Sequence, residues 1–94
     1  MNTRYFKKFW EETTGEELTD SWGDSTYFFE TDKNLNVIKQ IQLFRNGKIL
    51  KYNEQYLEDD FGGLADQQLE ITEFIDNEMT EVEFLEMWNK SDPQ

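Results

Sequence analysis

The sequence contains no cysteine and no histidine, and only one of its 94 residues is a proline. Without cysteine the chain has no disulfides and no thiolate nucleophile, and a small domain that lacks disulfides is typical of a reducing compartment. Without histidine it cannot build a Ser-His triad or a histidine-ligated metal site. We therefore expect a cytoplasmic protein that is not an enzyme.

Long apolar runs are also missing. No stretch approaches the roughly 20 apolar residues that a helix needs to cross a membrane, and the N-terminal residues MNTRY lack the apolar core of a signal peptide. The Gly62-Gly63 pair is not followed by the Lys-Ser/Thr pair of a phosphate-binding loop. The sequence predicts a soluble protein with no membrane partner and no cofactor.

Basic residues are scarce, and they are separated from the acids along the chain. Nine Lys and Arg residues stand against 21 Asp and Glu, for a net charge of −12. Residues 11–32 contain no base and residues 33–53 contain no acid. Binding to nucleic acid requires a basic face, so we do not expect nucleic acid as a direct partner. The acids either keep the protein soluble or attract a basic partner, and charge alone does not decide between these.

Aromatic residues make up 16% of the chain. Each can bury a large apolar area, which favours a folded core in spite of the high charge. A chain of 94 residues is the size of one domain. We therefore predict that residues 1–94 form a single acidic domain.

Four segments have the character of β-strands. Residues 3–10 and 25–31 are rich in aromatic residues, and residues 35–45 alternate at period two. Asn46-Gly47 predicts a two-residue hairpin turn with both residues at positive φ, followed by a strand over residues 48–52. In the third strand, the alternation predicts one face with Leu35, Val37, Ile41 and Leu43 and another with Ile38 and Phe44.

The C-terminal segment has the pattern of an amphipathic helix. Thr80 and Glu83 fit a capping box, and Val82, Leu85 and Trp88 fall on one helical face that we expect to be buried. Residues 54–68 are acidic and irregular, with Gly62-Gly63 breaking any regular element, and residues 69–76 fit either a helix or an extended segment. The prediction is an α+β fold, an approximately four-stranded and mainly antiparallel sheet with a C-terminal helix packed on one face.

Two acidic segments, residues 16–24 and 54–61, also contain aromatic residues. Aromatic side chains are enriched in interface hot spots, and neighbouring acids complement Lys and Arg on a partner. The alternatives are that the acids are solvated, or that the aromatic side chains anchor the loops to the core. No residue is predicted to be catalytic or to bind a metal or cofactor. The predicted partner-binding residues are Trp22, Asp20, Asp24, Tyr56, Glu58, Asp59, Asp60 and Phe61.

Three stretches carry a resemblance to a family of small bacterial domains of unknown function. They are RYFKKFW at residues 4–10, NVIKQIQLFRNGKILKY at residues 36–52 and EMTEVEFLEMW at residues 78–88. The matching residues are Val37, Lys39, Phe44, Asn46, Gly47 and Tyr52 in the hairpin and Met79, Glu83, Phe84 and Trp88 in the helix. Domains of this size and charge resemble immunity proteins of polymorphic-toxin and contact-dependent growth inhibition systems.

The resemblance implies a function. An immunity protein of this kind is cytoplasmic, and it binds and neutralises a basic toxin domain, often a nuclease, by occluding its active site. The alternative is a non-catalytic structural or adaptor domain in a bacterial assembly. A small carboxylate-dependent enzyme is a third hypothesis without a specific motif behind it. For the protein itself we expect a monomer or a weak dimer.

Overall fold

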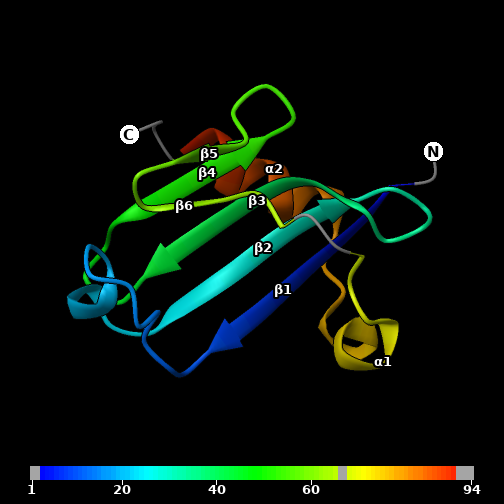
Figure 1. Ribbon diagram of the computed structural model, residues 1–94. Coiled ribbons are helices and arrows are strands. Elements are labelled where there is room, and N and C mark those ends of the chain that lie inside the picture. The colour runs from blue at the N-terminus through cyan, green and yellow to red at the C-terminus, as the bar shows by residue number, and fades with distance from the viewer. Residues whose placement is uncertain (1–2, 66–67, 91–94) are drawn as a thin grey trace.

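A four-stranded antiparallel sheet forms the centre of the computed structural model, which describes residues 3–65 and 68–90. Its strands follow one another in the order β1-β2-β3-β4 (Figure 1). The predicted α+β class and the four predicted strands are confirmed. The elements are β1 Arg4–Trp10, η1 Asp20–Trp22, β2 Ser25–Thr31, β3 Val37–Phe44, β4 Ile49–Asn53, β5 Glu58–Asp59, β6 Gly62–Gly63, α1 Ile71–Phe74, η2 Ile75–Asn77 and α2 Glu81–Lys90.

The turn between β3 and β4 differs from the prediction. The Phe44 amide donates to the Lys48 carbonyl at 2.9 Å, and the Gly47 amide donates to the Phe44 carbonyl at 2.9 Å. Gly47 has a φ of 91°, whereas Asn46 does not have positive φ. The loop therefore has three residues and only its last one is left-handed, so the predicted two-residue turn is wrong.

A β-bulge decides which residues of β3 face which side of the sheet. Glu30 pairs with Lys39, but the next residue, Thr31, pairs with Val37, so Ile38 is the extra residue. One extra residue in a strand turns the side chains of the residues before it to the opposite face of the sheet. Val37 therefore packs with Phe6 and Phe29 rather than with Ile41, and its predicted place beside Ile41 is wrong.

Helix α2 lies behind the sheet in the view of Figure 1. Its Phe84 is 0% exposed and packs among Tyr5, Phe28 and Ile41 from three strands. Met87 and Trp88 pack against the same cluster. Val82 is 65% exposed, so the predicted buried face through Val82, Leu85 and Trp88 is wrong. The helix is rotated about its axis so that Phe84 faces the sheet.

The predicted capping box starts α2. The Glu83 amide donates to Thr80 Oγ1 at 3.2 Å, and the Thr80 amide donates to Glu83 Oε1 at 3.1 Å. Two backbone donors that the first turn leaves unpaired are thereby satisfied.

Short elements cover the opposite face of the sheet. Phe74 of α1 packs on Phe6 and Phe29, so the undecided segment 69–76 is mainly helical. Gly62 and Gly63 form strand β6 against β5 instead of only breaking the chain. A Cβ on Gly63 would lie 3.0 Å from the Leu57 carbonyl oxygen, so glycine permits this close pairing. No helix in the described part of the chain is long and apolar enough to cross a membrane.

We expect Phe84→Ala to lower the free energy of unfolding by about 3–5 kcal/mol, because it leaves a cavity between α2 and three strands. Val82→Ala on the same helix is the matched control, and it should change stability by less than about 0.5 kcal/mol, since Val82 is exposed. Chemical denaturation measures both. Equal effects of the two variants would contradict the packing of α2 through Phe84.

The turn residue Gly47 provides a second test of the fold. Gly47→Val places a β-branched residue at a φ of 91°, which should lower the free energy of unfolding by about 1–3 kcal/mol. Gly47→Asn should cost clearly less, because Asn tolerates the left-handed region. Thermal melts of both variants are the measurement. If the Val variant were more stable than the Asn variant, this turn would be wrong.

Candidate partner-binding surface

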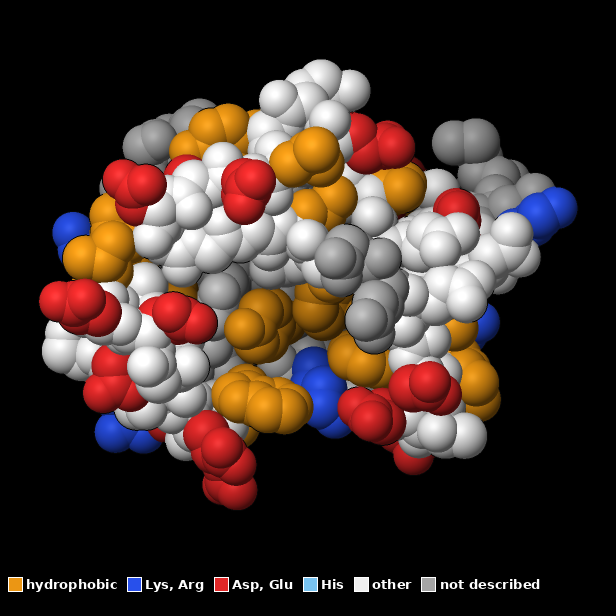
Figure 2. All heavy atoms as spheres, in the orientation of Figure 1, with side chains coloured by type: hydrophobic (Ala, Val, Ile, Leu, Met, Phe, Trp, Pro, Cys, Tyr) orange, Lys and Arg blue, Asp and Glu red, His pale blue; other side chains and the backbone are white. Residues whose placement is uncertain are grey.

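The two acidic segments, far apart in the sequence, meet at one end of the sheet. The turn η1 and the β5-β6 hairpin lie on the same side of the molecule in Figure 1, and Figure 2 shows acidic side chains gathered over that side. Between them is a groove of about 330 Å³, here called the acidic groove. It is lined by Glu16, Glu17, Leu18, Glu58, Asp59, Asp60, Phe61 and Gly62.

Aromatic contacts hold the two segments together. Trp22 packs edge-on against Phe44 of the sheet, with ring centroids 5.0 Å apart. It also contacts Phe61 of the hairpin, with centroids 5.2 Å apart. Trp22 therefore anchors both loops to the core. Phe61 remains 36% exposed, so it both anchors the hairpin and presents a surface.

Hydrogen bonds order the first segment. The buried Thr19 shares a hydrogen bond with the hydroxyl of Thr14, and the Asp20 carboxylate accepts from the Gly15 amide at 3.1 Å. Asp20 thus stabilises its own loop and does not line the groove. The neighbouring Glu16 and Glu17 have exposed side chains, so the loop presents their carboxylates to solvent.

Asp59 organises the second segment. Its carboxylate accepts hydrogen bonds from the hydroxyls of Tyr52 (2.8 Å) and Tyr56 (2.9 Å). It also accepts from the amides of Phe61 (2.9 Å) and Gly62 (3.2 Å). Burial by itself would raise the pKa of Asp59, but these hydrogen bonds outweigh it and lower the pKa below its ordinary value. For Asp59, the alternative of a freely solvated loop acid therefore does not hold.

Two further predicted residues lie outside the acidic groove. Tyr56 stacks on Tyr52 with centroids 6.0 Å apart and is 45% exposed, with its hydroxyl bound to Asp59. Hydrogen bonding to that carboxylate raises the pKa of Tyr56. Asp24 forms an ion pair with Arg45, which neutralises its charge. Of the eight predicted residues, the groove brings together Glu58, Asp59, Asp60 and Phe61.

The structure adds Glu16, Glu17 and Leu18, which lie in the predicted segment but were not singled out by sequence. Leu18 is 50% exposed. The signal in the sequence is a single leucine inside an acidic, turn-rich loop, where no core position is expected.

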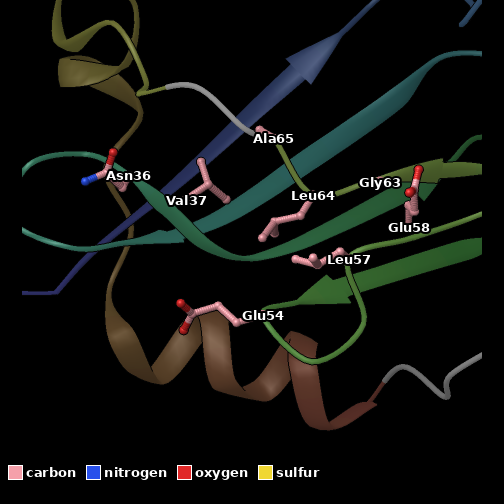
Figure 3. A pocket seen from close by; sticks show the side chains of 8 residues that line it. All are labelled: Asn36, Val37, Glu54, Leu57, Glu58, Gly63, Leu64 and Ala65. Carbon is pink, nitrogen blue, oxygen red and sulfur yellow. The ribbon is translucent and has the colours of Figure 1, made fainter.

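A second hollow, of about 540 Å³, lies beside the same hairpin (Figure 3). Leu57 and Leu64 lie next to each other there, and Val37 adds a third apolar side chain. Glu58 lines both this hollow and the acidic groove. Among the described residues, no Lys or Arg lines either one.

The groove combines exposed carboxylates with exposed apolar side chains. Within residues 3–65 and 68–90, no group of three or more acidic side chains is placed to hold a metal ion. Exposed carboxylates beside apolar side chains are suited to Lys and Arg of a protein partner, whose aliphatic stems pack while their charges pair.

The pH dependence of stability tests the role of Asp59. Because its folded pKa is lowered, Asp59 contributes stability that is present above its unfolded pKa of about 3.9 and is lost as the pH falls through the folded pKa. At pH 7, Asp59→Asn should lower the free energy of unfolding by about 1–3 kcal/mol. Below pH 4 the difference from wild type should shrink.

Asp60→Asn is the control, because Asp60 is exposed and has no hydrogen bond to another described residue. Its stability curve from pH 7 to pH 3 should run parallel to that of wild type. If Asp60→Asn and Asp59→Asn gave the same curve, Asp59 would not be the residue that holds the hairpin.

Comparison of the chain with protein families, with curated proteins and with solved structures finds no match in any of the three.

Proposed function

We propose that this protein is an immunity-type inhibitor that binds a basic bacterial toxin domain through the acidic groove. The observation that carries the proposal is the meeting of five carboxylates with exposed Phe61 and Leu18, in a groove that no basic residue of the described chain lines. A solvated acidic loop needs no such arrangement. A surface that binds a basic protein needs both the charge and the apolar contacts.

The two kinds of side chain act at different stages of binding. The net charge of −12 and the exposed Glu16, Glu17, Glu58 and Asp60 attract a cationic domain and raise its association rate. Once the partner is in place, Phe61 and Leu18 become desolvated and slow its dissociation. The anchoring of Phe61 on Trp22 lowers the entropic cost of this step, because the ring is already held.

A nuclease domain is the kind of toxin that best fits this surface. Nucleases bind phosphates with Lys and Arg, so the active site presents cations to which carboxylates of the groove are complementary. An inhibitor that pairs with these cations covers the substrate site directly. This part of the proposal rests on the resemblance to immunity proteins together with the charge of the groove.

Charge reversal of Glu58 and Asp60, the two hairpin acids whose side chains make no hydrogen bond to another described residue, tests the proposal. Glu58→Lys with Asp60→Lys should leave the fold intact and reduce the association rate with the toxin domain at least tenfold. Asp59 is left unchanged, since it holds the hairpin. The toxin domain encoded beside this protein in the native host is the binding partner to use, and surface plasmon resonance at two salt concentrations is the measurement.

The matched control is Asp76→Lys with Glu86→Lys, which changes the net charge equally. Both residues are exposed and lie on η2 and α2, away from the groove. The control should keep most of the association rate and protect cells that co-express the toxin. Equal losses in the two variants would show that only net charge matters. Absence of any binding to a basic toxin domain would favour the adaptor alternative.

A further inference from the structure

The outer edge of β1 is covered along only half of its length. The Tyr5 carbonyl accepts from the Met79 amide at 2.8 Å, and Phe6 forms an isolated antiparallel bridge with Glu78. Among the described residues, no strand pairs with β1 on this side beyond Phe6. In Figure 1 this second half of β1, which ends in the arrowhead, forms the lower left edge of the sheet.

The pairing at Tyr5 shows which backbone groups of β1 point outward. Tyr5 directs its carbonyl away from β2, and successive residues of a strand alternate in direction. Lys7 and Phe9 therefore direct their N–H and C=O groups outward, whereas Phe6, Lys8 and Trp10 direct theirs to β2. Phe9 thus presents an open donor and acceptor at the edge.

The side chains at this edge are large and exposed. Phe9 is 57% exposed and Trp10 is 45% exposed, one on each face of the sheet. Edge strands of folded proteins are commonly protected from pairing by a bulge, a proline, a covering loop or charged side chains such as Lys. Lys7 and Lys8 are such side chains here, so a partner strand must offer each of them a complementary residue. The bulge of this sheet lies between β2 and β3, so it does not protect β1.

We propose that the open half of β1 pairs with the same segment of a second copy, joining two sheets into one. The two strands would run antiparallel about a two-fold axis at Phe9. Lys7 of each copy then lies opposite Glu11 of the other, and Lys8 lies opposite Trp10. The first pair is of opposite charge. In the second, the Lys8 ammonium, which lies 5.3 Å from the centre of the Phe74 ring in the single copy, exchanges that ring for the indole of Trp10. The segment KKFWE is therefore complementary to itself.

Other registers fit less well. A two-fold axis perpendicular to the sheet keeps each face continuous, so the centre must fall on a residue. Centring on Lys8 places two lysines opposite each other. Centring on Trp10 replaces the Lys7–Glu11 pair by Lys8 opposite Glu12, where the chain already bends away from the strand direction. In the Phe9 register, Glu12 of the second copy would lie opposite Phe6, which already pairs with Glu78. The chain bends at Glu12, so the second copy turns away from the edge before it meets Glu78.

This dimer is independent of the proposed inhibitor function, because its residues are not those that line the acidic groove. The net charge of −12 on each copy opposes association at long range, and salt screens that repulsion. The dimer should therefore be tighter at about 0.3 M salt than at about 0.03 M salt, because this tenfold rise shortens the screening length about threefold. Binding of a basic partner should show the opposite trend.

Exchange of the two charges tests the register. Lys7→Glu and Glu11→Lys each place like charges opposite one another, and each should raise the dimer dissociation constant about tenfold. The double variant restores the pair and should return to within about threefold of wild type. One single variant makes the chain more acidic and the other less, so a general charge effect would move them in opposite directions. Sedimentation velocity is the measurement.

Phe9→Pro tests the backbone pairing. It removes the outward N–H, which makes no bond to β2, so the variant should stay folded by circular dichroism and be monomeric. Phe9→Ala removes the ring but keeps the donor, and it should retain weaker dimers. The proposal is overturned if wild type is monomeric at about 1 mM, if Phe9→Pro dimerises as well as Phe9→Ala, or if Glu11→Lys dimerises more tightly than wild type.

Discussion

The carboxylate of Asp59 is the group on which the candidate surface depends. It joins the fully buried Tyr52 of the sheet, the half-exposed Tyr56 and two amides of the β5-β6 turn. A two-stranded hairpin this short is not stable in water by itself. Because one charged acceptor satisfies four donors, the turn holds a single shape, and the position of Glu58, Asp60 and Phe61 follows from it.

Seven acids of the two acidic segments therefore fall into two groups. Asp59, Asp20 and Asp24 bind donors within the molecule, so their charges are already compensated by local structure. Glu16, Glu17, Glu58 and Asp60 are exposed at the same groove and are available to a partner. Repulsion among them costs stability, which is the usual consequence of concentrating one sign of charge. The proposed basic partner would relieve it, and under that proposal binding would add to stability.

The two faces of the sheet are covered differently. Helix α2 closes one face through Phe84, and this packing uses residues from three strands. The other face carries only short elements, which leave hollows beside the hairpin. A rigid closed face supporting an open one is a common way to present binding residues, because the scaffold holds loops that have few contacts of their own.

Local patterns in the sequence determined the four strands, the capping box of Thr80 and Glu83, and the acidic character of the loops, because each depends on neighbours a few residues apart. They did not determine which side of the sheet Val37 faces, since the bulge at Ile38 depends on pairing with β2. Nor did they separate Asp59 from Asp60, two adjacent aspartates with opposite roles. Only the tertiary structure decided this, because the donors that distinguish Asp59 include Tyr52 of another strand and the hairpin's own turn.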